Sequence, residues 1–403
     1  MFKRHGDFQR FDNKIWLSTP TFYADELEFV KDAVEENSMT YSGRNISSVE
    51  ETILEMTKRK YAVSVSSGTA ALHLAVKLAG VKKGDRVFCS DLTFSATANV
   101  IMYEGAIPVF IDSEADTWNM SPQALEKAFE KYPEVRVIVF AHLFGIPAKI
   151  DDIKKIAKRH GAFIVEDAAE VLGAKYKGVT LAKHGDASCL SFNKNKIITG
   201  TGGGMLLTDN EKDAEKARKW SVQSREKAPW YEHTEIGYNY AVSNITAGII
   251  RGQLPHLEEH IAKKKAIYER YKVGFSDLPV LMNPFDEENS APNFWLSCMT
   301  VDKNAMCRQI RSETEALFKA ESQKTCPTEI LQALQLINAE GRPIWKPMHL
   351  QPVFSGCDFV TASNLPDGTG ADVFERGLCL PSDIKITKSQ QDKIIEAVRA
   401  CLD

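Results

Sequence analysis

The sequence predicts an α/β protein with a mostly parallel central sheet covered by helices on both faces, followed by a smaller α+β domain. Between residues 61 and 255, short apolar runs alternate with segments of helical spacing, a pattern typical of parallel sheets. After residue 255 the alternation stops, and longer amphipathic and Pro-rich segments follow. We therefore expect a large domain over residues 1–255, with an N-terminal arm over 1–25, and a small domain over 256–403.

The first strand is predicted at Tyr61–Ser66, a short run that contains β-branched residues. Thr69–Gly80 follows with helical spacing and ends in glycine, a common signal at a helix C-terminus. Val87–Ser90 and Ile107–Ile111 are predicted to be buried strands, and Ser95–Tyr103 between them a helix.

Three more segments continue the alternation. Val137–Ala141 and Ala162–Glu166 are predicted to be strands because both are short and apolar. Ile150–His160 lies between them and is predicted to be a helix, with acidic residues in its first turn and basic residues in its last. That charge order complements the helix dipole.

The C-terminal part mixes helical and strand-like segments. His256–Phe275 is predicted to be one long amphipathic helix rich in Lys and Glu, and Phe294–Val301 a strand. The polar stretch Ser312–Asn338 is expected to be helix-prone, and the Pro-rich segment Arg342–Phe354 irregular. Ser389–Leu402 is predicted to be the last helix.

Composition narrows the class of protein. The chain has 403 residues, with 50 basic and 54 acidic side chains and a formal net charge of −4. This balance offers no broad positive field for nucleic acid or for an anionic membrane. No apolar run reaches the roughly 18 residues of a membrane span, and the charged N-terminus does not resemble a secretory signal. The 8 cysteines are scattered, without zinc-site spacing, so we expect a cytoplasmic enzyme without a metal.

A first candidate site is the turn Ser66-Ser67-Gly68-Thr69-Ala70, between a predicted strand and a predicted helix. Glycine lets backbone N–H groups approach an anion, and a helix N-terminus adds partial positive charge, so the turn can cradle a phosphate. The alternative is an ordinary N-cap formed by Ser67 or Thr69.

A second candidate is Asp167, in the run Val165–Glu170 at the end of an apolar strand. Ligands of open α/β sheets bind beyond the carboxyl ends of the strands, where an acid can hold a proton on a partner base. The alternative is an Asp that caps a following helix.

A third candidate is the segment Ser191–Thr199, followed by the glycine-rich run Gly200–Gly204. It contains Lys194 and Lys196, and a lysine in a desolvated pocket can act as an amine nucleophile that forms a Schiff base. The alternative is two surface lysines beside a flexible loop. The spacing does not fit a P-loop nucleotide site.

The order of the three candidates is more informative than each alone. A phosphate turn, a strand-end acid and then a lysine are what pyridoxal 5′-phosphate (PLP) requires. The acid keeps the pyridine nitrogen protonated, so that the ring becomes an electron sink, and the lysine binds the aldehyde.

At this point the sequence resembles the DegT/DnrJ/StrS sugar aminotransferases, PLP enzymes of fold type I, the aspartate aminotransferase-like fold. The likeness extends over nearly the whole chain. The stretches that carry it are IWLSTP (15–20), SSGTAALHLA (66–75), TFSATANVI (93–101), GAIPVFID (105–112), VEDAAE (165–170), SFNKNKIIT (191–199), EIGYNY (235–240), RPIWKPMHLQPVF (342–354) and RGLCLPSD (376–383).

The resemblance implies roles for residues in the three candidate motifs. Lys196 matches the Schiff-base lysine, five residues after the phosphate-binding Ser191, and Lys194 is the weaker candidate. Asp167 matches the acid that pairs with the pyridine nitrogen, and Glu170 lies where the family places a residue near the ring hydroxyl. Gly68 and Thr69 match the phosphate-binding turn.

The resemblance also implies roles outside those motifs. Phe94 matches the aromatic residue that stacks on the cofactor ring, although by itself it would more often belong to the core. Asn239, by itself a turn residue, matches an asparagine that reaches the phosphate of the neighbouring subunit. This implies a homodimer with shared active sites. The segment 342–354 offers four candidate contacts to a nucleotide-sugar: Arg342, Trp345, Lys346 and His349.

Three departures from the family pattern affect substrate contacts more than cofactor chemistry. Ala241 stands where members commonly have Arg, Gly200–Gly202 where many carry an acid or serine, and residues 304–341 are unusually polar.

The resemblance implies transamination from L-glutamate to a nucleotide-linked 4-keto-6-deoxy sugar. Within the family, the sequence most resembles the UDP-N-acetylbacillosamine aminotransferases. This implies a UDP-linked N-acetylhexosamine as the substrate and a role in surface glycan biosynthesis. Two alternatives are a PLP-dependent sugar 3-dehydratase and a non-catalytic regulatory subunit. Relatives that act as 3-dehydratases carry His at the position of the Schiff-base lysine.

Overall fold

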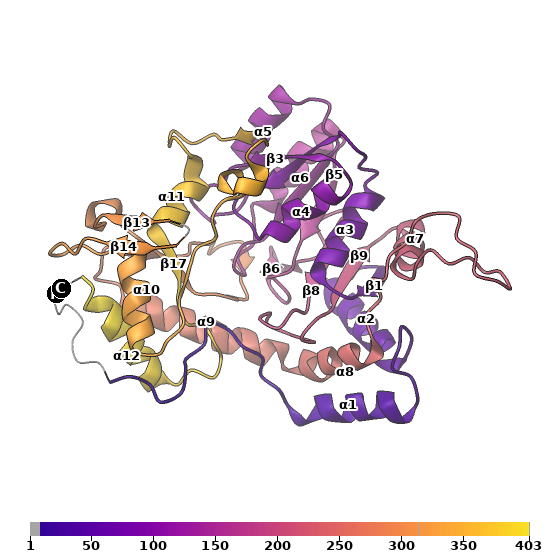
Figure 1. Ribbon diagram of the computed structural model, residues 1–403, viewed down its shortest axis with the longest axis horizontal. Coiled ribbons are helices and arrows are strands. Elements are labelled where there is room, and N and C mark those ends of the chain that lie inside the picture. The colour runs from indigo at the N-terminus through magenta and orange to yellow at the C-terminus, as the bar shows by residue number, and fades with distance from the viewer. Residues whose placement is uncertain (1–8, 313, 403) are drawn as a thin grey trace.

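The computed structural model describes residues 9–312 and 314–402, and its centre is an eight-stranded sheet (Figure 1). Every neighbouring pair is parallel except the two formed by β9, which runs antiparallel to β1 and β8. The predicted α/β class with a mostly parallel sheet is therefore confirmed. The strands, in spatial order, are β1 (Tyr61–Val65), β9 (Gly204–Thr208), β8 (Ala187–Ser191), β5 (Phe163–Asp167), β4 (Val137–Ala141), β2 (Arg86–Ser90), β3 (Ile107–Ile111) and β16 (Phe359–Val360).

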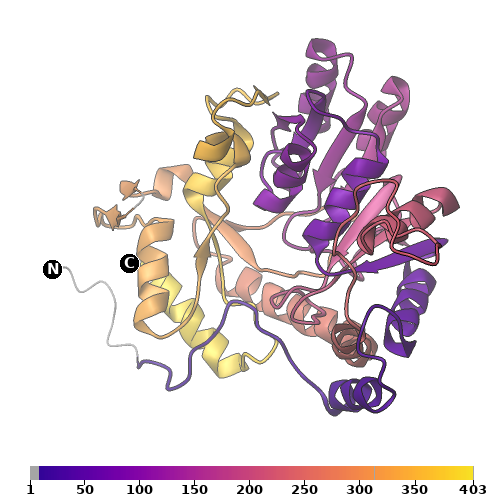
Figure 2. The same ribbon diagram turned by 45° about the vertical axis from the view of Figure 1, so that its right-hand side comes forward.

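Helices cover both faces of this sheet because its central strands are apolar on both sides. In β2, Val87 and Cys89 share one core cluster with residues of α3, α4 and α7, whereas Phe88 packs with residues of α5 and α6. Figure 2 shows helices on both sides of the sheet. The covering helices are α3 (Gly68–Leu78), α4 (Ser95–Tyr103), α7 (Glu211–Ser221), α5 (Pro122–Lys131) and α6 (Ile150–His160).

The C-terminal part contains a four-stranded antiparallel sheet with its own apolar core. Long helices pack on it, and α9 extends from it toward the large sheet (Figure 1). The elements are β10 (Val280–Met282), β12 (Cys298–Val301), β17 (Gly377–Cys379), β15 (Arg342–Pro343), α9 (Leu257–Gly274), α10 (Pro327–Leu336), α11 (Gly368–Arg376) and α12 (Lys388–Arg399).

Two element expectations are wrong in part. The predicted strand Phe294–Val301 is a strand only over Cys298–Val301, which is β12. Of the helix-prone stretch 312–338, only α10 is α-helical, and residues 316–318 form β14, which pairs with β13 (Gln309–Arg311) as a hairpin. Pro327 at the first turn of α10 explains the late start, since proline is well tolerated there and disfavoured further inside a helix.

Two segments lie across the boundary that the sequence places at residue 255. Phe11 and Ile15 of the N-terminal arm pack in the core of the C-terminal part. Conversely, β16 pairs with β3 at the edge of the large sheet. The helices α1 (Ala24–Glu35), α2 (Arg44–Thr57) and α8 (Asn244–Gln253) pack together beside the large sheet. Among the described residues no helix has the length and apolar character needed to cross a membrane.

Candidate active site

A cavity of about 300 Å³ opens at the carboxyl edge of the parallel strands, where ligands of such sheets bind. The ends of β4, β5 and β8 and the start of α3 form its walls. Eight of the residues singled out from the sequence line it: Gly68, Thr69, Phe94, Asp167, Glu170, Ser191, Lys196 and Trp345.

The predicted phosphate turn lies at one wall. Ser67 caps α3, since its Oγ accepts from the Ala70 amide at 3.0 Å, so the N-cap alternative is correct for this residue. The cap does not exclude an anion. A Cβ at Gly68 would lie 2.8 Å from the Cβ of Ser191, so only glycine lets α3 approach β8 this closely. The helix N-terminus and the hydroxyls of Thr69 and Ser191 therefore meet at the cavity and offer donors to a phosphate.

Asp167 ends β5 and caps no helix, because the residues that follow it form turns. Its Oδ2 accepts from the Thr97 hydroxyl at 2.7 Å and its Oδ1 from the Ala169 amide at 3.2 Å. Burial raises the pKa of Asp167, and these two hydrogen bonds oppose the increase. A buried carboxylate held this way would gain from a cationic partner in the cavity.

Lys196 points its amine into the same cavity. Its Nζ lies 3.3 Å from Oε1 of Glu170 and 4.1 Å from the ring centre of Trp295, and its side chain is 12% exposed. Burial raises the pKa of Glu170 to about 7, and the nearby lysine charge and the Phe144 amide oppose that shift. Lys194, in contrast, is exposed and does not line the cavity.

Aromatic rings surround the cavity mouth. Phe94 is 57% exposed, which is inconsistent with the core alternative, and its ring centre lies 5.6 Å from that of Trp345. Trp345 in turn lies 5.0 Å from Phe144 and 6.5 Å from Trp295. Flat faces of this kind suit a flat ligand ring.

Asn239 is exposed and lies outside this cavity. It follows a hairpin-like loop that leaves the body of the protein after α7, held together by bridges between Val222 and Asn239 and between Arg225 and His233 (Figure 1).

Three of the four substrate candidates also lie outside the cavity. The His349 Nδ1 is 2.7 Å from Oδ2 of Asp91, and its ring stacks on Phe359. Lys346 is half-buried. Arg342 is exposed and pairs with Glu340.

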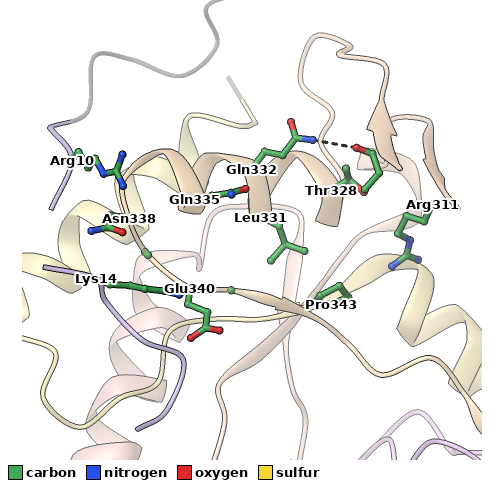
Figure 3. Close-up of a pocket in the computed structure, with 13 residues that line it drawn as sticks. Arg10, Lys14, Arg311, Thr328, Leu331, Gln332, Gln335, Asn338, Glu340 and Pro343 are labelled. Atoms are coloured by element: carbon green, nitrogen blue, oxygen red, sulfur yellow. Dashed lines mark hydrogen bonds between the residues drawn. The ribbon is translucent and has the colours of Figure 1, made fainter. Parts of the chain in front are cut away.

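Glu340 lines a separate hollow of about 530 Å³ between α10 and the N-terminal arm (Figure 3). Its basic residues include Arg311, which pairs with Glu375, and Lys14, which lies over the ring of Trp16. None of the predicted site residues lines this hollow.

Three site residues were missed from the sequence. Thr97 lies inside one of the matching stretches, and its place in the first turn of α4 carried no chemical signal. Phe144 and Trp295 lie in segments that had no predicted role, and Trp295 is about 100 residues from the lysine it contacts. Only the tertiary fold brings it there.

Comparison with known proteins places the chain among sugar aminotransferases. The profile of the DegT/DnrJ/EryC1/StrS aminotransferase family matches residues 20–399. EpsN of Bacillus subtilis (strain 168), named as a pyridoxal phosphate-dependent aminotransferase, is 40% identical over 96% of this chain and 95% of its own length. The GDP-perosamine synthase of Escherichia coli O157:H7 is 30% identical over 94% of this chain and 96% of its own.

Solved structures show the same fold. A DegT/DnrJ/EryC1/StrS aminotransferase from Brucella abortus superposes with a TM-score of 0.81 and 25% identity, covering 93% of this chain and 94% of its own. The sugar aminotransferase Spr1654 of Streptococcus pneumoniae, in its PLP form, gives a TM-score of 0.85 at 23% identity, covering 96% and 98%.

Proposed function

Because the chain belongs to the DegT/DnrJ/EryC1/StrS aminotransferase family, we propose that it transfers an amino group from L-glutamate to a nucleotide-linked 4-keto-6-deoxy sugar. As a member of this family it is a PLP-dependent aminotransferase of fold type I. The observation that carries the proposal is the meeting of Lys196, Asp167 and the α3 N-terminus in one cavity.

The chemistry of this cavity fits PLP. The α3 N-terminus, with Thr69 and Ser191, would hold the phosphate, and Gly68 leaves the approach open. Asp167 is the buried anion for the pyridine nitrogen, and Phe94 offers a face to the ring. When bound, PLP supplies an electron sink that stabilises negative charge at the α-carbon of an amino donor.

Lys196 is the group that binds the cofactor aldehyde and then acts on protons. When it is not bound to the cofactor, its Nζ would be the base that takes a proton from the α-carbon of the amino donor and, once protonated, the acid that gives the proton back. Oε1 of Glu170, 3.3 Å from Nζ, holds this amine in the cavity.

Addition of L-glutamate to the purified PLP-loaded protein tests the donor. The visible absorption of the lysine-bound cofactor is expected to disappear as 2-oxoglutarate is released, and spectrophotometry follows both. Absorption that L-glutamate leaves unchanged would instead favour the non-catalytic subunit.

The acceptor is proposed to be a UDP-linked N-acetylhexosamine in a surface glycan pathway, by likeness to the bacillosamine aminotransferases. Because the chain is also similar to a GDP-perosamine synthase, GDP-linked sugars are included among the acceptors to be tested. An assay of UDP-, GDP- and dTDP-linked 4-keto sugars with glutamate separates them. The dehydratase alternative is disfavoured because position 196 is Lys, and a cytoplasmic location stays a prediction from the sequence.

We also propose a homodimer with shared active sites. The loop that precedes Asn239 projects from the body of the protein (Figure 1), and three of its apolar side chains are exposed: Trp230 at 65%, Tyr231 at 77% and Ile236 at 78%. Exposed aromatic residues on a projecting loop are typical of a surface covered by a partner.

Mixed dimers test the sharing. Lys196→Ala and Asn239→Ala subunits are each expected to be inactive as homodimers. If Asn239 serves the partner's site, half of the sites in a hybrid are intact, and random mixing restores about a quarter of wild-type activity. Activity after co-expression is the measurement, and no restoration would place Asn239 in its own subunit's site.

A further inference from the structure

The carbonyl oxygens of Asn195 and Ile197, the two residues next to Lys196, accept hydrogen bonds from distant parts of the chain. The Asn195 carbonyl accepts from Nε1 of Trp295 at 2.7 Å and from Oγ of Ser18 at 3.2 Å. The Ile197 carbonyl accepts from Nδ1 of His260 at 2.8 Å. The main chain on each side of the amine-bearing residue is therefore fixed by side chains that are not its sequence neighbours.

Both sets of hydrogen bonds lead to the N-terminal arm and to one face of α9. The buried Lys264 donates to Oγ of Ser18 at 3.2 Å, which leaves the serine proton for Asn195. One turn earlier on α9, His260 must carry its proton on Nδ1, because a carbonyl can only accept. Burial lowers the pKa of His260, so its ring is neutral and Nε2 accepts from the Tyr23 hydroxyl at 2.8 Å.

The arm itself is firmly attached. Lys385 donates to the Pro20 carbonyl at 2.8 Å, and Ser382 donates its amide to the Leu17 carbonyl at 2.8 Å. The Thr19 amide donates to Oδ2 of Asp383 at 3.0 Å. In Figures 1 and 2 the arm, drawn in indigo, runs past α9 on its way to α1.

A small cavity lies between the arm, α9 and the lysine loop, and Ser18, Lys196, His260 and Lys264 all line it. The arm and α9 thus contact the lysine loop at a cavity separate from the one that contains Asp167 and Glu170.

We propose that Ser18 and Tyr23 of the N-terminal arm, acting with Lys264 and His260 of α9, are positioning residues for Lys196. They hold residues 195–197 so that the amine stays between Glu170 and Trp295. Small displacements of a reacting group lower rates strongly, so hydrogen bonds that fix the main chain act on kcat rather than on substrate affinity. The inference rests on the proposed function of Lys196.

Thr21, in the same arm, provides a control position for these substitutions. The Oγ1 of Thr21 is buried without a hydrogen-bond partner among the described residues, and Thr21 lines the same small cavity. Thr21→Val therefore removes a hydroxyl from the arm without removing a hydrogen bond. Ser18→Ala removes the hydrogen bond to the Asn195 carbonyl, and Tyr23→Phe removes the hydrogen bond to His260, the residue that holds the Ile197 carbonyl.

Steady-state kinetics and hydrogen exchange test the proposal. Ser18→Ala and Tyr23→Phe are each expected to lower kcat about 3- to 10-fold with KM for L-glutamate unchanged. Ser18→Thr is expected to recover most of the loss, and Thr21→Val to match the wild type. In the apoprotein, the Lys196 amide, which donates to the Asn193 carbonyl at 2.9 Å, is expected to exchange faster in the first two variants.

The outcomes separate this inference from the proposed function. Wild-type kcat and exchange in both Ser18→Ala and Tyr23→Phe would overturn the positioning role, as would equal losses in Thr21→Val. If the wild type itself neither binds PLP nor responds to glutamate, the proposed function fails instead.

Discussion

Lys196→Ala is expected to abolish transamination, with kcat lowered by about 10⁴-fold or more. The substitution removes the only amine among the residues that line the cavity, and that amine both binds the cofactor and moves the proton. We expect the purified variant to lack visible absorption, and borohydride reduction followed by mass spectrometry to find no cofactor on the 191–199 segment.

Lys194→Ala is the matched control. Lys194 lies two residues earlier in the same loop and carries the same charge, but it is exposed and outside the cavity. Its activity and absorption are expected to stay near those of the wild type. The opposite pair of results, an active Lys196→Ala and a colourless Lys194→Ala, would reject the assignment.

The parts of the fold that the sequence predicted are those whose signal is local. Val137–Ala141 is a strand with the predicted bounds because all five residues are buried on both faces, and Ile150–His160 is a helix with the predicted bounds because its charges and apolar stripe agree. The hairpin of β13 and β14 was missed because each strand has only three residues and its apolar side chains Ile310 and Leu317 are exposed, so no buried-strand pattern marks it and helix propensity dominated the expectation.

The candidate site also combines residues that a local sequence signal indicates with residues that only the tertiary fold brings to it. Gly68 begins α3, Asp167 ends β5 and Lys196 lies in the loop that follows β8, so their order along the chain already indicated one edge of a sheet. Trp295 and Ser18 reach Lys196 only through contacts between distant segments, and no spacing rule encodes those. Arg342 was selected for its charge, but its neighbour Glu340 already satisfies that charge.

Asp167→Asn is expected to have opposite effects on the apoprotein and on the holoenzyme. Burial raises the pKa of Asp167 in the folded apoprotein above its unfolded value. Its contribution to folding stability is therefore present at low pH and is lost as pH rises through the folded pKa. At neutral pH the isosteric amide removes that cost, so the Tm of the apoprotein should equal or exceed that of the wild type, and the difference should vanish in acid.

In the holoenzyme the same substitution removes the anion that would face the protonated ring nitrogen. Loss of one partner of a buried ion pair costs about 3–5 kcal/mol, which corresponds to a decrease of about 10²- to 10⁴-fold in kcat. PLP should also raise the Tm of the variant less than that of the wild type.

Asp186→Asn provides the comparison. Asp186 directly precedes β8 and lies beside the start of β5, where its Oδ2 accepts from the Ile164 amide at 2.7 Å, and it does not line the cavity. An asparagine oxygen can still accept that hydrogen bond, so both Tm and kcat should change little. A wild-type kcat in Asp167→Asn would mean that the ring nitrogen needs no charge at this position. A lower apoprotein Tm would mean instead that the carboxylate is a structural anchor for Thr97.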